Sequence, residues 1–322
     1  MRRRPGTAAV LALVAALAVA GCDRTGEDRP NASATIALDA RPAAVDAGLE
    51  LMLVRDFDGA EGVELRLQAR TARTTALERL TSRRAQFAVL DIHDLARARE
   101  RGRDVVGVMA LVQRPLAAVI AQPRIARPRD LEGGRVGVTG LPSDDAVLSS
   151  IVRGDGGDPA KVKKVTIGFE AVTALLARKV DAATAFWNAE GVALEAKRPG
   201  MHQFKVDDYG APPYPELVLC VSRQTLDEDR SLVAATVRAL RRGYEETIND
   251  PESAVEALVD QAHVDRAATA SELDAVSPAF TEGVTRYGEL DPTALAAWAR
   301  WEARFGITKR PPDVARAFAP GF

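Results

Sequence analysis

The sequence has 322 residues, a formal net charge of −2 and 47% hydrophobic residues, which is enough chain for two compact lobes with buried cores. The near-neutral charge provides neither a basic surface for nucleic acid nor an acidic tail, so we expect no nucleic-acid partner. No spacing of cysteine and histidine resembles a zinc or iron–sulfur site, so we expect no metal and no cofactor.

The N-terminal segment 1–22 is predicted to be a lipoprotein signal peptide. Three arginines, Arg2–Arg4, precede an uncharged apolar run, 11–20, that is too short to span a bilayer comfortably. The run ends at Gly21 and Cys22, in a pattern that resembles a bacterial lipobox. By that resemblance Cys22 carries the lipid and becomes the mature first residue, which anchors the protein on the extracytoplasmic face of the cell membrane. An ordinary signal peptide with an incidental cysteine is the alternative.

The following segment, 23–33, is polar and contains Gly, Pro, Asn and Ser, so we expect a flexible tether. Besides Cys22 the chain has only Cys220, which lies in the apolar run 217–221. A lone thiol makes no intrachain disulfide, and Cys220 is expected to be a small buried hydrophobe.

Short apolar runs then alternate with amphipathic stretches, in two successive sets. The first set predicts strands at 35–38, 63–67, 87–90 and 105–112 and helices at 45–57, 74–84 and 92–101. The second set predicts strands at 116–121, 135–139, 165–167, 180–186 and 217–221 and helices at 143–153, 170–177 and 190–197. Strand–helix alternation favours parallel strands with right-handed crossovers. In this pattern Thr74 or Thr75 and Ser143 are expected to cap their helices.

After Ser222 the pattern becomes helical, with helices predicted at 231–249, 251–261, 267–276 and 292–305. We therefore predict an α/β protein of two lobes with a helical C-terminal tail. Lobe one is expected to hold 34–118 and 218–322, and lobe two 119–217. The runs 116–121 and 217–221 would be the two crossing strands of the hinge. A single doubly wound domain is the alternative.

Five stretches resemble one group of substrate-binding proteins of ABC importers, those for thiamine pyrimidine precursors and related heteroaromatics, with a more distant similarity to those for sulfonates and nitrate. These stretches are 112–118, 130–137, 186–192, 208–218 and 241–244, in family order. The resemblance implies the type II periplasmic-binding architecture, a ligand cleft at the hinge, a monomer, and a permease and ATPase complex as partner.

The chain departs from the family in the stretch 39–48. Where the family often has a Trp, an Asn and a His, this sequence has Ala40, Ala43 and Asp46. The departure removes one aromatic platform and two polar contacts, which puts the identity of the ligand in doubt while leaving the fold expectation intact.

Clefts in open α/β sheets lie beyond the carboxyl ends of the strands, so candidate binding residues should follow strands. Trp187 offers a face on which a heteroaromatic ring could stack, and Glu190 could accept hydrogen bonds from a ring amine. In the alternative reading Trp187 packs a helix start, Asn188 caps it and Glu190 lies in its first turn.

Tyr209 and Tyr214 flank a Gly/Pro-rich loop before the last strand, and Glu216 begins that strand, so these residues are candidates for the cleft wall or, for Glu216, for solvent. Ser143 and the free N–H groups at its helix start could bind an anion, although helix capping alone would explain them.

Asp39, Asp91 and Gln113 complete the candidate set. Asp39 and Asp91 each follow a strand, and Gln113 lies at the hinge end of lobe one. Asp39 could equally be a structural carboxylate, Asp91 could cap the next helix, and the neighbouring His93 is expected to be a surface residue.

No catalytic motif is recognisable, since the chain lacks a nucleophile elbow, a phosphate loop and a His-Glu-x-x-His zinc motif. We therefore expect a binding protein rather than an enzyme. A binding protein for a sulfonate or another small anion, an exported pyrimidine-processing enzyme on the same scaffold, and a sensory or structural lipoprotein are the alternatives.

Overall fold

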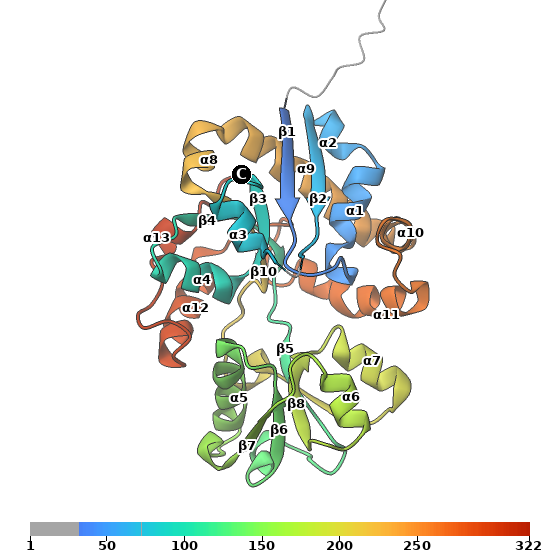
Figure 1. Cartoon of the computed structure of the whole chain (residues 1–322), viewed down its shortest axis with the longest axis vertical. Helices are drawn as coiled ribbons and strands as arrows, with labels where there is room; N and C mark the ends of the chain where they lie inside the picture. The colour runs from blue at the N-terminus through green and yellow to red at the C-terminus, as the bar shows by residue number, and fades with distance from the viewer. Residues whose placement is uncertain (1–31, 72) are drawn as a thin grey trace, which may run out of the picture.

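A computed structural model describes residues 32–71 and 73–322 (Figure 1). The described chain forms two five-stranded sheets, one above the other in Figure 1. In order across the sheet, the first consists of β2 (Val63–Gln68), β1 (Ala32–Ala37), β3 (Phe87–Asp91), β10 (Leu217–Ser222) and β4 (Val105–Val112). The second consists of β7 (Lys163–Thr166), β6 (Arg135–Val138), β8 (Ala182–Phe186), β5 (Ala117–Ala121) and β9 (His202–Lys205). Two separate sheets exclude the alternative of a single doubly wound domain.

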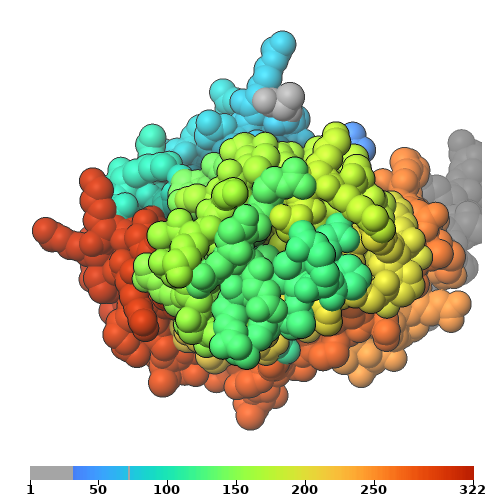
Figure 2. Space-filling model, turned by 90° about the horizontal axis from the view of Figure 1, so that it is seen from below, coloured from blue at the N-terminus to red at the C-terminus, as the bar shows by residue number. Residues whose placement is uncertain are grey.

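Each sheet with its helices forms one lobe, and Figure 2 shows lobe two lying in front of lobe one when the molecule is seen from below. Lobe one carries η1 (Ala44–Asp46), α1 (Ala47–Val54), α2 (Phe57–Ala60), α3 (Ala76–Thr81), α4 (Ile92–Glu100), α8 (Arg223–Glu228), α9 (Arg230–Asn249), α10 (Pro251–Ala262), α11 (Arg266–Val276), η5 (Ser277–Phe280), α12 (Pro292–Arg304) and α13 (Val314–Ala317). Lobe two carries η2 (Pro128–Leu131), α5 (Pro142–Gly154), η3 (Pro159–Lys161), α6 (Ala171–Leu176), α7 (Glu190–Lys197) and η4 (Val206–Tyr209).

The prediction of parallel strands holds for part of each sheet. Strand β1 runs parallel to β2 and β3, and β6 runs parallel to β7 and β8. It is wrong for β10 and β5, because β10 pairs antiparallel with β3 and β4, and β5 pairs antiparallel with β8 and β9. The physical reason is the route of the chain: β5 and β10 each enter their sheet from the side that faces the other lobe.

The chain passes between the sheets twice, through 113–116 and through 206–216. The prediction that the runs 116–121 and 217–221 themselves cross the hinge is wrong, because β5 belongs wholly to the second sheet and β10 wholly to the first. The two connections are tied together, since the Glu216 carboxylate accepts the N–H of Leu116 at 2.7 Å. The boundaries expected for the lobes, 34–118 with 218–322 and 119–217, stay a prediction.

The hydrophobic core of lobe one lies on both faces of its sheet. All eight residues of β4 are buried, although β4 lies at the edge of the sheet. The C-terminal tail covers this edge, because Gly288 O accepts the N–H of Ala110 and Gly107 O accepts the N–H of Ala319. The predicted helical tail is thus part of lobe one and protects a strand edge that would otherwise be exposed.

Local capping explains where two helices begin. Thr75 caps α3 and forms a capping box with Glu78, which confirms the expected cap. The expected cap at Ser143 is wrong, because α5 begins at Pro142 with Leu141 as its N-cap residue. Proline suits the first helical position, where its missing N–H costs nothing.

Several elements differ from the prediction. The helix expected at 45–57 is divided by Asp56, whose φ of 52° is left-handed. The short strand β9 was not predicted because its sequence contains no apolar run, and the helices α8 and α13 were not predicted either. Strand β1 includes residues 32 and 33, which we had assigned to the tether.

The signal peptide, Cys22 and most of the tether lie outside the described residues. Within 32–71 and 73–322, the structure contains no helix that is both long enough and apolar enough to cross a membrane.

Candidate ligand-binding cleft

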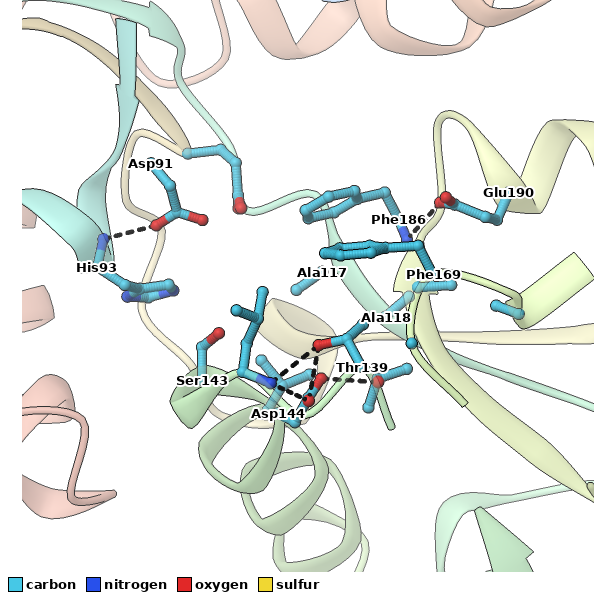
Figure 3. A pocket seen from close by; sticks show the side chains of 17 residues that line it. Asp91, His93, Ala117, Ala118, Thr139, Ser143, Asp144, Phe169, Phe186 and Glu190 are labelled. Atoms are coloured by element: carbon cyan, nitrogen blue, oxygen red, sulfur yellow. Dashed lines mark hydrogen bonds between the residues drawn. The ribbon is translucent and has the colours of Figure 1, made fainter. Parts of the chain in front are cut away.

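A pocket lies between the two lobes, with residues of both in its wall (Figure 3). Lobe one and the second connection contribute polar groups, and lobe two contributes most of the apolar surface. The lining residues are Asp91, His93, Ala117, Ala118, Thr139, Leu141, Ser143, Asp144, Val147, Gly168, Phe169, Ala171, Thr184, Ala185, Phe186, Glu190 and Glu216.

The lobe-one side of the pocket is acidic. Asp91 is the last residue of β3 and pairs with Leu217 of β10, which places Glu216 directly beside it. Asp91 caps α4 by accepting the N–H of His93 at 2.6 Å. Burial, followed by the negative charge of Asp91, raises the pKa of Glu216 to about 8. Burial also raises the pKa of Asp91, against the opposing effect of the positive charge on His93.

His93 also lines the pocket but is only 4% exposed, so the expectation of a surface histidine is wrong. Its Nδ1 pairs with the carboxylate of Glu302 from α12, and its Nε2 lies 3.4 Å from Tyr214 Oη. Burial lowers the pKa of His93, but the charges of Glu302 and Asp91 outweigh burial and raise it to about 10. His93 is therefore a cation whose charge is compensated by Glu302.

The start of α5 forms the floor of the pocket, and the two backbone N–H groups just before the helix are already occupied. The Asp144 carboxylate accepts the N–H groups of Gly140 and Leu141 and the hydroxyls of Thr139 and Thr184. Ser143 lines the pocket next to this group of hydrogen bonds. No Lys or Arg is among the lining residues, all of which belong to the described part of the chain. An anion would therefore meet carboxylates at both ends of the pocket.

Two phenylalanines supply the aromatic surface of the lobe-two side. Phe169 follows β7 and is 74% exposed, and Phe186 ends β8 and is 42% exposed. Both rings point toward the pocket (Figure 3). Sequence reasoning missed them, although their positions at or after strand ends were a usable signal. Glu190 lies nearby and accepts the N–H of Phe186 at 3.0 Å.

The neighbouring Trp187 is 6% exposed and lies outside the pocket wall. Its Nε1 donates to Pro115 O at 2.9 Å, and the ammonium of Lys205 lies 4.0 Å from the ring centre. The stacking role predicted for Trp187 does not fit this placement, because the indole anchors β8 to the first connection between the lobes. Asn188 is also buried, and its Oδ1 has no hydrogen-bond partner among the described residues.

The two predicted tyrosines also lie outside the wall. Tyr214 is fully buried behind it, with its ring 5.3 Å from that of His93. Tyr209 is half-buried and packs edge-on against Phe204 in lobe two. Neither tyrosine presents a face to the pocket, because Tyr209 packs on lobe two and Tyr214 packs against His93 and Trp301 of lobe one.

Asp39 and Gln113 have structural partners elsewhere in lobe one. Asp39 accepts the N–H of Ala76 at 3.1 Å and borders a separate surface hollow. The Gln113 amide donates to Glu289 O at 2.9 Å. Of the ten predicted binding residues, the structure thus brings four together in the pocket wall, namely Asp91, Ser143, Glu190 and Glu216.

With this geometry described, comparison with known proteins identifies the family. The family model described as NMT1/THI5 like matches residues 55–254. The chain belongs to the NMT1/THI5-like family. This match confirms the predicted family.

Two curated proteins are similar to this chain in sequence. The formylaminopyrimidine-binding protein of Halalkalibacterium halodurans is 29% identical over 252 residues, which cover 77% of this chain and 76% of the relative. A putative thiamine biosynthesis protein of Haemophilus influenzae is 26% identical over 161 residues, which cover 49% of this chain and 51% of the relative.

Solved structures confirm the predicted fold. The aliphatic sulphonate binding protein SsuA of Escherichia coli superimposes with a TM-score of 0.73 at 15% identity, over 90% of this chain and 92% of that one. The alkanesulfonate-binding protein SsuA of Xanthomonas axonopodis pv. citri gives a TM-score of 0.69 at 15% identity, over 90% and 98%. The NMT1/THI5-like chain therefore has the two-lobe periplasmic-binding fold.

Proposed function

We propose that this protein is the extracytoplasmic solute-binding lipoprotein of an ABC importer and captures a small heteroaromatic, such as a thiamine pyrimidine precursor, by closure of the two lobes. The observation that carries the proposal is the pocket between the lobes, which has polar groups on one side and two exposed aromatic rings on the other. A ligand that contacts both sides binds the closed state better than the open one and shifts the population toward closure.

A heteroaromatic is favoured over a sulfonate by the chemistry of the wall. Phe169 and Phe186 provide flat apolar surface, and Asp91, Glu190 and Glu216 provide hydrogen-bond acceptors for ring amines. The lining contains no Lys or Arg, and the Asp144 carboxylate lies at the start of α5, so a sulfonate would lack a cationic partner and would meet a negative charge. The name of the relative at 29% identity supports the same ligand class.

Binding without turnover is supported by the nature of the wall. Cys220 lies fully buried in β10, and burial raises the pKa of its thiol well above the usual range, which makes it inert as a nucleophile. His93, which lines the pocket, is engaged through its Nδ1 with Glu302. An exported pyrimidine-processing enzyme on the same scaffold remains the second candidate, because the family match alone does not separate the two.

The membrane anchor belongs to the same proposal. The lipobox-like sequence at Cys22 supports lipidation and an extracytoplasmic location, and the tether would hold the pocket within reach of a permease. Mass spectrometry of the protein purified from membranes tests this part, with a diacylated Cys22 as the expected N-terminus. An unmodified N-terminus elsewhere would contradict it.

The binding function is tested by thermal shift and calorimetry with a panel of aminopyrimidines, flavins, alkanesulfonates and nitrate. We expect at least one aminopyrimidine to stabilise the protein and the anions to have no effect, since a ligand at 100 times its Kd adds about 2.7 kcal/mol. Stabilisation by no compound would overturn the proposal. Chemical conversion of a bound pyrimidine would favour the enzyme.

A further inference from the structure

The two walls of the pocket differ in charge as well as in polarity, and this difference specifies the ligand further. We propose that the pocket selects a ligand with a cationic nitrogen, which Asp91 and Glu216 hold while Phe169 and Phe186 contact its ring, and that binding expels a proton from the carboxylate pair. The inference rests on the proposed function and names the charge state of the molecule that this same site takes.

Glu216 has the geometry of a ligand-holding group. Its side chain is 2% exposed, yet it lines the pocket. Its Oε2 accepts the N–H of Leu116. Its Oε1 makes no hydrogen bond to any residue in 32–71 or 73–322, and this oxygen is accessible to solvent in the pocket. Because Oε1 is open to the pocket and unused by the protein, it is available to accept an N–H of a ligand.

The charges around this oxygen leave the wall negative. Of the groups that face the pair, His93 is compensated by Glu302, Asp207 is bound by Arg114, and Asp94 is paired with Arg97, while Tyr214 is neutral. Neither Asp91 nor Glu216 forms an ion pair with a Lys or Arg of the described chain, and the single positive charge of His93 is shared among Glu302, Asp91 and Glu216. Two adjacent buried carboxylates cannot both ionise readily, so the pair keeps a proton near neutral pH, consistent with a Glu216 pKa of about 8.

A cationic ligand nitrogen would take the place of that proton. The step is a simple exchange: the carboxylic acid loses its proton to solvent, and the resulting carboxylate accepts N–H bonds from the ligand cation. No covalent bond of the ligand changes. A charge-assisted bond of this kind is stronger than a neutral one, whereas a neutral ligand would leave the proton in place. Affinity for a cation should therefore rise with pH until the pair is fully ionised.

The inference is tested with three aminopyrimidines that share one ring and differ only in one side group, namely aminomethyl, hydroxymethyl and carboxylate. We expect the aminomethyl compound to bind about tenfold more tightly than the hydroxymethyl compound, and the carboxylate not to bind. Calorimetry near pH 7 in two buffers of different ionisation enthalpy should show release of close to one proton, and the aminomethyl affinity should rise toward pH 8.

Glu216→Gln keeps an acceptor for the N–H of Leu116 and removes the charge, so we expect the aminomethyl advantage to shrink to about threefold or less. Glu64→Gln, on the exposed face of β2, is the matched control and should keep the full advantage. The buffer measurement on the unmodified protein needs no variant. Equal or tighter binding of the hydroxymethyl compound, or binding of the carboxylate, overturns this inference alone. Binding of none of the three, nor of any compound in the wider panel, overturns the proposed function as well.

Discussion

At the residue scale, the aromatic side of the pocket consists of side chains that contribute little to folding. Phe169 is 74% exposed and Phe186 is 42% exposed, so their rings are held for contact with something other than the core. We expect Phe169→Ala to leave the free energy of unfolding within about 0.5 kcal/mol of the parent and to weaken ligand binding about tenfold.

Calorimetry with the tightest aminopyrimidine and thermal melting without ligand measure these two effects. Val54→Ala, which removes an exposed apolar side chain of lobe one away from the pocket, should change neither. Unchanged affinity in Phe169→Ala would show that this ring is not part of the binding surface.

The buried pair of His93 and Glu302 gives a second prediction at this scale. Both side chains are at most 5% exposed, and removal of one charge leaves the other buried without compensation. Glu302→Gln should therefore destabilise the protein by about 3 kcal/mol in denaturant unfolding. The double variant with His93→Gln should regain part of this loss, because no unpaired charge remains. Equal losses in the single and double variants would contradict the pairing.

At the scale of elements, the start of α5 is held by one carboxylate. Asp144 accepts four hydrogen bonds, from two backbone N–H groups and two threonine hydroxyls, and its side chain is buried. Asp144→Ala leaves these donors unsatisfied, and we expect a loss of about 2 kcal/mol in the free energy of unfolding.

The next residue supplies the matched control for this prediction. Asp145 lies in the same turn of α5 but is exposed and bonds only to the ammonium of Lys164. Asp145→Ala should cost about 0.5 kcal/mol or less by the same denaturant titration. Similar losses in both variants would mean that a general charge effect at the helix start, rather than the Asp144 hydrogen bonds, holds the element.

At the scale of the whole molecule, the buried acids couple stability to pH. Burial raises the pKa of Asp46 to about 6, of Glu50 to about 7 and of Glu216 to about 8. The folded protein therefore binds more protons than the unfolded chain between about pH 4 and pH 8, so stability falls as pH rises through this window. The raised pKa of His93 acts in the same direction, since its contribution is complete below about pH 6.5 and is lost toward pH 10.

Denaturant unfolding of the unliganded protein at pH 5 and pH 8 checks this prediction, with higher stability expected at pH 5. Glu216→Gln should flatten the upper part of the profile, because the amide does not titrate. A profile that rises from pH 5 to pH 8 would contradict the assignment of buried, proton-binding acids. A tightly bound cationic ligand should reverse part of the slope by holding the carboxylates ionised.

The alternation of apolar runs was sufficient to predict most helices and strands, because hydrophobic periodicity is local and repeats along each element. The strands at 87–90 and 105–112 and the helix at 190–197 match the structure closely. The two-lobe fold also followed from two successive α/β sets. Strand direction was less predictable, because antiparallel insertion of β5 and β10 depends on the side from which the chain enters each sheet.

Residues of the candidate site were predictable only where their position next to a strand end places them in the pocket wall. Asp91, Ser143, Glu190 and Glu216 follow or precede strands at the cleft edge, and the structure places all four in the pocket wall. Residue type was a poor guide to the orientation of a side chain. Phe186 ends β8 and points to the pocket (Figure 3), whereas the next residue, Trp187, is buried. Successive side chains of a strand face opposite sides, so a shift of one residue exchanges them.

The sequence by itself determined the family, the two-lobe α/β fold and the neighbourhood of the cleft, because these depend on local patterns and ordered motifs. Only the tertiary structure decided which aromatic rings face the pocket, that Glu302 of the C-terminal tail pairs with His93, and that two carboxyl groups lie side by side in the pocket wall. The physical reason is that the charge balance and the burial of a side chain depend on all of its neighbours in space. Many of these neighbours come from distant parts of the chain, so a local sequence pattern does not reveal them.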